Sequence, residues 1–108
     1  MTINELEKSL NLKRLSEGED REVTSCYISD MLSRVMGGLN AGAVWVTVQT
    51  SLNMIAVATL AEASCVILPE DLTAPYEVTE RAKEENIVIF SSSDDAFALA
   101  KKIAGLLQ

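Results

Sequence analysis

The sequence predicts an α/β protein of three layers, in which helices cover both faces of a mainly parallel β-sheet. Segments of strand and helix character alternate along the chain from about residue 22 onward. The predicted strands, such as residues 43–48 and 64–68, are apolar on both faces, which is typical of parallel strands buried between helices. With 108 residues, the chain is long enough for one such domain, over residues 1–108, and too short for a second core.

The first predicted helix begins just after Thr2. Thr2 and Glu5 have the spacing of a capping box, in which the side chain of each residue accepts a hydrogen bond from the backbone N–H of the other. Ile3, Leu6 and Leu10 then recur at the spacing of one helical face. We therefore expect a short N-terminal helix with one apolar side.

Two strands and a second helix are expected next. Residues 12–15 predict a short strand that gives the sheet a mixed or antiparallel edge, and residues 22–28 predict a strand because they favour extended structure. Ser29-Asp30 has the polar character of a helix start. Gly37-Gly38 predicts the end of that helix, because glycine accepts a left-handed backbone there.

The rest of the chain continues the alternation of strands and helices. Thr50 or Ser51 is expected to cap the third helix, and Pro75 suits the first turn of the fourth. The expected elements are a strand at 43–48, a helix at 51–61, a strand at 64–68, a helix at 73–86, a strand at 87–90 and a helix at 96–107.

Charge and composition restrict the partners of this chain. Sixteen acidic and nine basic residues give a net charge of −7, which repels nucleic acid and anionic membrane surfaces. No apolar run reaches the roughly 18 residues that span a bilayer, and the charged N-terminal residues do not read as a signal peptide. Cys26 and Cys65 lie within apolar runs, as buried, reduced thiols do. We expect a cytoplasmic protein.

The side chains present exclude several kinds of catalysis. The chain contains no histidine, which excludes catalytic triads and dyads in which a histidine activates a serine or cysteine nucleophile. Two unpaired cysteines do not make a zinc site. No phosphate-binding loop of the Walker or dinucleotide type is present. We therefore expect no enzyme activity, no cofactor and no metal. The alternative is a minimal enzyme that uses Asp30, Glu70 or Cys65.

Polar residues follow the predicted strands, at the edge where parallel α/β sheets usually bind ligands. A phosphate-bearing ligand is one candidate, since helix starts offer free N–H groups to anions. The alternative is that these residues only cap helices. Gln49 comes before the cap, so its amide needs a ligand, a second side chain or a subunit contact as a partner. The candidate ligand-binding residues are Ser29, Asp30, Gln49, Thr50, Ser51, Asn53, Ser91, Ser92 and Ser93.

The helix at 51–61 is apolar all round, which requires burial on all sides. We expect one face of it to cover the sheet, namely Leu52, Ile55, Ala56, Thr59 and Leu60. The opposite face is then left over and predicts a two-fold homodimer. The candidate interface residues are Met54, Val57, Ala58 and Ala61. The alternative is that another helix of the same chain covers this face.

Several motifs resemble those of the DRTGG domain family, over about residues 20–107. The resemblance depends on Asp20-Arg21 followed by Thr24, on the segments 27–37 and 45–58 with their Gln-Thr and Ala-Val-Ala motifs, and on Leu-Pro-Glu at 68–70. The chain departs from the family pattern at Ser25, where a glycine is expected.

The resemblance implies a fold related to the N-terminal domain of HPr kinase. Such domains accompany CBS pairs in regulated pyrophosphatases and also acetyl-transfer enzymes, whose activities are not implied for this accessory domain. Stand-alone members are similar to small proteins encoded beside iron-only hydrogenases. We therefore expect a non-enzymatic, homodimeric regulatory or interaction domain that acts on a separate partner, a hydrogenase-linked enzyme being one context. The alternative is a sensor of a nucleotide or another phosphate-bearing ligand.

Overall fold

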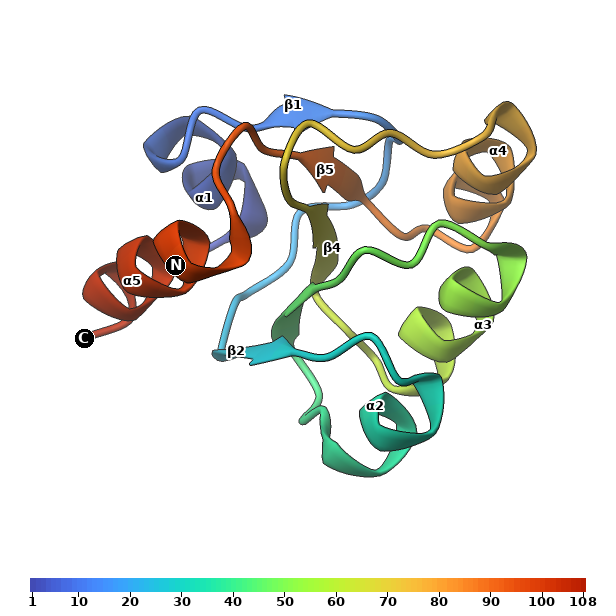
Figure 1. Ribbon diagram of the computed structural model, residues 1–108, viewed down its shortest axis with the longest axis horizontal. Coiled ribbons are helices and arrows are strands. Elements are labelled where there is room, and N and C mark those ends of the chain that lie inside the picture. The colour runs from blue at the N-terminus through green and yellow to red at the C-terminus, as the bar shows by residue number, and fades with distance from the viewer.

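The computed structural model describes all 108 residues, and Figure 1 shows its helices and strands. In chain order the elements are α1 (Ile3–Ser9), β1 (Lys13–Arg14), β2 (Ser25–Ile28), α2 (Leu32–Gly38), β3 (Ala43–Val46), α3 (Leu52–Leu60), β4 (Cys65–Leu68), α4 (Tyr76–Glu84), β5 (Ile89–Ser91) and α5 (Ala96–Leu106). None of these helices is both long enough and apolar enough to cross a bilayer.

One five-stranded sheet organises the chain, in the order β1-β5-β4-β3-β2. Strands β2 to β5 are parallel, whereas β1 pairs with β5 in the antiparallel direction. The predicted fold class is thus confirmed, including the extra strand of the N-terminal region. Strand β3 is shorter than predicted, because the Val48 N–H donates to the Asp30 carboxylate and so leaves the ladder.

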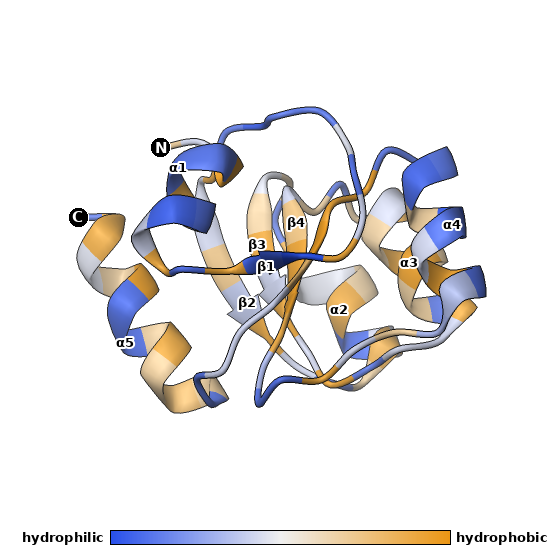
Figure 2. Cartoon of the chain, turned by 90° about the horizontal axis from the view of Figure 1, so that it is seen from above, coloured by the Kyte–Doolittle hydropathy of each residue, from blue (hydrophilic) through white to orange (hydrophobic).

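The sheet separates two apolar cores (Figures 1 and 2). Helices α2, α3 and α4 cover one face, where Trp45 is fully buried, and helices α1 and α5 cover the other, where Phe90 is fully buried. All four residues of β3 and all four of β4 are buried. Both-face burial explains why the sequence of these strands shows no polar alternation.

Local signals in the sequence set most helix starts. The Thr2 and Glu5 capping box forms as predicted, and the Ser51 side chain caps α3. Asp95 caps α5 by accepting a hydrogen bond from the Ala98 N–H at 2.8 Å. The prediction for α2 was wrong, because the helix begins at Leu32 and Asp30 does not cap it.

The two glycines at the end of α2 do not have the predicted role. Neither Gly37 nor Gly38 has a positive φ, and the chain leaves α2 through an extended Leu39. Gly38 instead makes room for Tyr27, because a Cβ at position 38 would overlap the Tyr27 phenol. The glycine with a left-handed backbone is Gly42, with a φ of 86° in the turn before β3.

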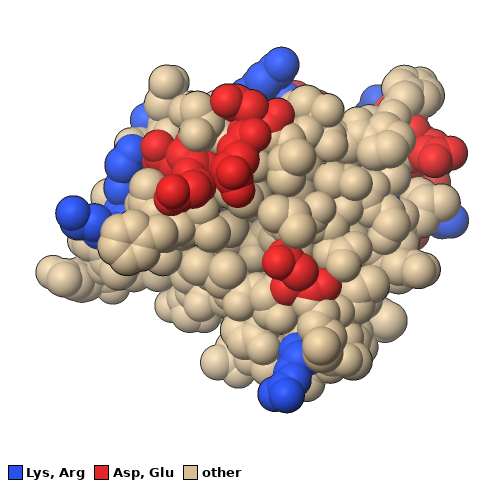
Figure 3. Space-filling view, viewed as in Figure 1, with Lys and Arg blue, Asp and Glu red and all other residues tan.

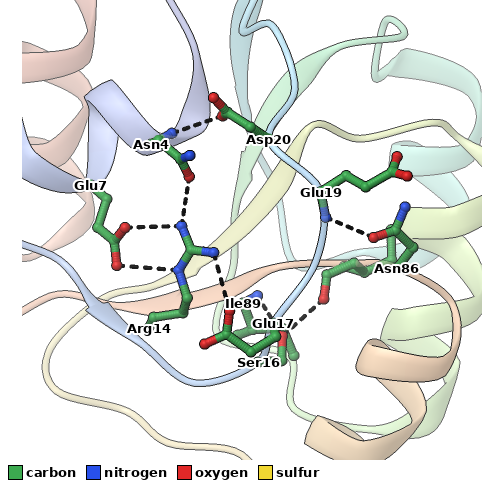
Figure 4. A network of polar contacts seen from close by, with 10 residues as sticks. Asn4, Glu7, Arg14, Ser16, Glu17, Glu19, Asp20, Asn86 and Ile89 are labelled. Carbon is green, nitrogen blue, oxygen red and sulfur yellow. Dashed lines mark hydrogen bonds and ion pairs between the residues drawn. The ribbon is translucent and has the colours of Figure 1, made fainter.

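Arg14 fastens the N-terminal segment to the sheet (Figure 4). Its guanidinium donates hydrogen bonds to both carboxylate oxygens of Glu7, at 2.9 and 3.2 Å, and to the Asn4 Oδ1 at 2.8 Å. It also lies 3.5 Å from the Glu17 carboxylate and 5.2 Å from the centre of the Phe90 ring. The hydrogen bonds to Glu7 are the main cause of a raised Arg14 pKa. These contacts connect α1, β1 and β5 in one network.

Candidate functional site

The four parallel strands end at one edge of the sheet, called here the carboxyl edge. The loops that leave this edge are residues 29–31, 47–51, 69–75 and 92–95. All nine candidate ligand-binding residues belong to these loops, to the end of β5 or to the first turn of α3. The structure therefore brings the predicted residues to the same edge, where parallel α/β folds bind ligands.

Asp30 connects the loops that follow β2 and β3. Its Oδ1 accepts hydrogen bonds from the Thr47 hydroxyl at 2.8 Å and from the Val48 N–H at 2.9 Å. The Gln49 side-chain amide donates to the Asp30 carbonyl oxygen at 2.8 Å. The partner that Gln49 requires is thus found within the chain. Asp30 acts as a brace between two loops rather than as a helix cap.

The two serines beside this brace are also engaged. The Ser29 Oγ accepts a hydrogen bond from the Met31 N–H at 3.3 Å, and the Ser29 carbonyl accepts one from the Trp45 indole at 2.9 Å. The Ser51 Oγ accepts from the Met54 N–H at 3.4 Å. Turn formation and capping therefore account for both hydroxyl groups, as the alternative interpretation of the sequence proposes.

The loops after β4 and β5 are joined by main-chain hydrogen bonds. Glu70 and Asp71 have φ angles of 59° and 57°, a left-handed backbone that costs roughly 1–2 kcal/mol per residue without glycine. Their N–H groups donate to the Asp94 and Ser92 carbonyls at 2.9 and 2.8 Å. The Ser91 hydroxyl donates to the Leu72 carbonyl at 2.7 Å. These bonds hold a strained loop in a defined shape.

Three of the candidate side chains keep free hydrogen-bonding capacity. Thr50, Asn53 and Ser93 make no side-chain hydrogen bond within the chain, and Asn53 and Ser93 are exposed. Beside them on the same edge, Met31 and Val48 expose 59% and 47% of their surface. The edge thus combines a small set of free polar groups with an apolar surface.

The carboxyl edge is acidic. Its loops contain Asp30, Glu70, Asp71, Asp94 and Asp95, and they contain no lysine or arginine. Figure 3 shows acidic side chains at the upper left, below the centre and at the right edge, with a wide uncharged area between them on the face viewed. A phosphate group at this edge would therefore depend on hydroxyl and backbone N–H donors, since no cationic side chain of these loops is available.

Of the three residues of the alternative minimal enzyme, Cys65 lies apart from the other two. Cys65 is the first residue of β4 and fully buried, whereas Glu70 follows the other end of that strand and Asp30 follows the end of β2. Burial raises the Cys65 pKa to about 12, and burial also raises the pKa of Cys26. Such thiols stay protonated and are poor nucleophiles at neutral pH. The described residues contain no cluster of three potential metal ligands.

The face of α3 that was expected to be free is the face that covers the sheet. Met54 and Ala58 have no exposed surface, and Val57 and Ala61 pack partly buried against the same core. The assignment of Met54 and Ala58 to an outward face was wrong, since a contact of either residue with a second copy would require the core to open. Val57 and Ala61 keep part of their surface exposed.

The outward face of α3 is made of residues that were expected to cover the sheet. Leu52 and Leu60 expose 44% and 70% of their surface, and Ala56 is exposed as well, whereas Ile55 is buried as predicted. The two faces were exchanged because a helix that is apolar all round has no polar side to indicate its orientation. A groove of about 340 Å³ lies beside the outward face, between α3 and α4.

Three of the residues that carry the family resemblance, Asp20, Arg21 and Thr24, lie at the opposite, amino edge of the sheet. The Asp20 carboxylate accepts a hydrogen bond from the Asn4 N–H at 3.0 Å, in the first turn of α1. The Arg21 guanidinium donates to the Asn86 carbonyl at 2.8 Å and to the Ala63 carbonyl at 3.5 Å. Arg21 therefore ties the turns that precede β4 and β5 to the segment before β2.

Thr24 completes this arrangement. Its hydroxyl donates to the Ala41 carbonyl at 3.1 Å. A Cβ added to Gly42 would lie 2.9 Å from the Thr24 Oγ1. Sequence reasoning gave Asp20, Arg21 and Thr24 no role. The hydrogen bonds show that these residues support the fold, and no periodicity in the sequence indicates such long-range contacts.

Comparison with known proteins agrees with this arrangement. The family model of the DRTGG domain matches residues 5–106, and no curated protein matches the chain. Among solved structures, the chain is similar to the CBS and DRTGG domains of the regulatory region of Clostridium perfringens pyrophosphatase, complexed with the activator diadenosine tetraphosphate. The TM-score is 0.76 at 18% identity, a likeness that shows the fold.

That match covers 94% of this chain and 45% of the pyrophosphatase chain, so this chain spans less than half of the neighbour's length. The family model, in contrast, covers nearly all of the 108 residues. The chain belongs to the DRTGG domain family.

Proposed function

We propose that this domain is a non-enzymatic regulatory module that forms a homodimer and acts on a separate partner protein. Membership of the DRTGG family supports a regulatory role, since the similar solved structure is a regulatory region complexed with an activator. The observation that carries the proposal is the outward face of α3. Leu52, Ala56 and Leu60 there form an exposed apolar ridge without charged residues.

The geometry of this ridge suits two-fold pairing. Its residues are spaced by four, so they lie in a row on one side of the helix. When two copies of α3 cross antiparallel at Ala56, Leu52 of each copy meets Leu60 of the other, and the small Ala56 lets the backbones approach closely. Such self-complementarity is what a two-fold interface requires.

Charge supports the same face. Each copy carries a net charge of −7, so two copies repel each other over most of their surface. Helix α3 contains no charged residue, and the charges lining the groove beside it are Arg81 and Glu85, which lie 3.9 Å apart. This pair can also exchange partners across a two-fold axis.

The test is the oligomeric state of matched variants, measured by sedimentation and light scattering at 10–50 μM. We expect a dimer for the wild type and a monomer for Leu60→Glu, with an unchanged helical signal in circular dichroism. Phe97→Glu is the matched control, because Phe97 is more exposed than Leu60 and lies on the other side of the sheet. A monomeric wild type, or a dimeric Leu60→Glu variant, would contradict this interface.

A second candidate function is the binding of a nucleotide at the carboxyl edge. The free side chains of Thr50, Asn53 and Ser93 supply polar contacts, and exposed Met31 and Val48 supply an apolar surface on which a base can stack. The similar pyrophosphatase region is complexed with diadenosine tetraphosphate, which supports a nucleotide as the class of ligand.

Thermal shift and calorimetry with adenine and guanine nucleotides, including diadenosine tetraphosphate, test this second function. A ligand at 100 times its Kd stabilises the fold by about 2.7 kcal/mol, which raises Tm by several degrees. Asn53→Ala should weaken nucleotide binding. Asn40→Ala is the control and should not weaken it, because Asn40 is also exposed but lies outside these loops. If no nucleotide shifts Tm at millimolar concentration, the carboxyl edge does not serve as a nucleotide site.

A further inference from the structure

A second groove, larger than the one beside α3, lies between α1 and α5. It has a volume of about 720 Å³, and its lining includes Leu10, Phe97, Lys101, Lys102, Gly105 and Leu106. Because α1 and α5 cover one face of the sheet and α3 covers the other, this groove is separate from the proposed dimer face. It also lies outside the loops of the carboxyl edge.

The groove presents apolar side chains that the fold itself does not use. Phe97 exposes 79% of its surface and Leu106 exposes 36%, whereas Leu99 and Ile103 on the inner side of α5 are fully buried. Helix α5 therefore has one stripe that serves the core and a second stripe along the groove. A large aromatic side chain left so exposed is typical of residues that anchor a partner.

Gly105 leaves part of the groove surface without a side chain. It lies in the last turn of α5, its φ is not positive, and a Cβ added to it would meet no atom within 4 Å. Glycine in a helix is less stable than alanine, so nothing within this chain favours a glycine at this position. On the groove, the missing side chain leaves room for the backbone of another molecule to approach closely.

The charge of the groove is opposite to that of the whole molecule. Lys101 and Lys102 line the groove in a chain with a net charge of −7. Lys102 pairs with Asp94 at 2.7 Å, whereas Lys101 makes no ion pair within the chain. In Figure 3, basic side chains gather on the left, where Figure 1 places α5. A partner with carboxylates beside its apolar residues complements this pattern.

We propose that the groove between α1 and α5 binds an acidic amphipathic helix of a separate protein. The apolar side of that helix covers Phe97 and Leu106, its backbone passes over Gly105, and its carboxylates pair with Lys101 and Lys102. Helix α5 has 11 residues and is about 16 Å long, which matches roughly three turns of a partner helix. The inference rests on the proposed function, because it names the surface by which the domain contacts its partner.

The test selects peptides on the purified full chain from a phage-displayed library of 16-residue helical peptides. We expect enrichment of sequences with apolar residues at helical spacing and flanking Asp or Glu. In fluorescence anisotropy, Phe97→Ala should weaken a selected peptide at least 10-fold. Tyr76→Ala should leave it unchanged, since Tyr76 is 78% exposed on α4, across the sheet. The double variant Lys101→Glu/Lys102→Glu should reverse the charge preference. It should bind a version of the peptide with lysine in place of the acidic residues more tightly than it binds the original peptide.

Two glycine variants separate docking from stability. Gly105→Ala and Gly37→Ala each replace a helical glycine whose added Cβ meets no neighbour, so each should raise Tm by about 2–4 °C. Only Gly105→Ala should weaken the peptide, because Gly37 lies in α2 on the other side of the sheet. Equal affinity for both variants would show that no backbone packs at Gly105, and the proposed binding mode would be wrong.

Other outcomes overturn the proposal as well. These are the absence of any enriched peptide, enrichment of basic or purely apolar peptides, or binding that is indifferent to Phe97→Ala. A dimer that dissociates in Phe97→Ala would identify the groove as a contact between copies of this chain instead. The proposed dimer fails separately, through a monomeric wild type or an unaffected Leu60→Glu variant, while peptide binding at the groove persists.

Discussion

The brace formed by Asp30 is expected to stabilise the carboxyl edge measurably, and Asp30→Ala tests this. The substitution removes the acceptor of the Thr47 hydroxyl and of the Val48 N–H. Thr47 exposes 2% of its surface, so its hydroxyl loses its acceptor at a buried residue. The Val48 N–H lies at the surface and can exchange its protein acceptor for water.

The magnitude follows from these two environments. A buried hydroxyl donor without an acceptor costs about 1–3 kcal/mol, and the loss of a surface hydrogen bond to a carboxylate costs about 1 kcal/mol more. We therefore expect Asp30→Ala to lower the free energy of unfolding by about 2–4 kcal/mol. For a domain of this size, that loss corresponds to a decrease of roughly 8–16 °C in Tm.

Urea unfolding followed by circular dichroism measures the difference. Glu70→Gln is the control, because Glu70 is an exposed carboxylate of the same edge whose side chain makes no hydrogen bond. In a double-mutant cycle with Thr47→Val, which removes the buried hydroxyl, the cost of Asp30→Ala should decrease by about 1–3 kcal/mol. If Asp30→Ala stays within 0.5 kcal/mol of the wild type, the brace does not stabilise the domain and the reasoning fails.

Two further predictions concern the interior and the amino edge. Gly42→Ala should cost about 2–3 kcal/mol in urea unfolding, because the residue has a φ of 86° and the new Cβ would lie 2.9 Å from the Thr24 Oγ1; a loss below 0.5 kcal/mol would contradict this. Burial raises the Cys65 pKa from 9.0 to about 12, so the unfolded chain releases this proton first and stability falls as pH rises above 9. The loss from this residue should reach about 1.4 kcal/mol at pH 10 relative to pH 7, and Cys65→Ala should flatten the pH profile by that amount.

Most of the fold could be predicted from the sequence, because its signals are local. The capping box at Thr2 and the caps at Ser51 and Asp95 depend on residues within four positions of each other. Strands β3 and β4 are apolar on both faces, and that property alone indicates a parallel sheet between helices. The antiparallel β1 was also predicted, from a short extended segment near the N-terminus.

The candidate site could be predicted only in its position. Parallel strands bring Asp30 and Gln49 to one edge whatever their partners are, so the location follows from the topology. Their hydrogen bonds to each other join different loops, and sequence spacing does not indicate such bonds. The orientation of α3 could not be predicted for a different reason. Met54 and Leu52 are similarly apolar, and only the packed neighbours decide which of the two is buried.

The position of Asp20, Arg21 and Thr24 has a consequence for comparisons between members of the family. These residues hold the turns at the amino edge, whereas the proposed ligand contacts belong to loops at the other end of the strands. This part of the signature therefore reports on the scaffold, whereas Gln49-Thr50 and Pro69-Glu70 lie in loops of the carboxyl edge. Two members that share Asp20, Arg21 and Thr24 can still differ in the segments 47–51 and 69–75, and their sequences should be compared there for a difference in ligand.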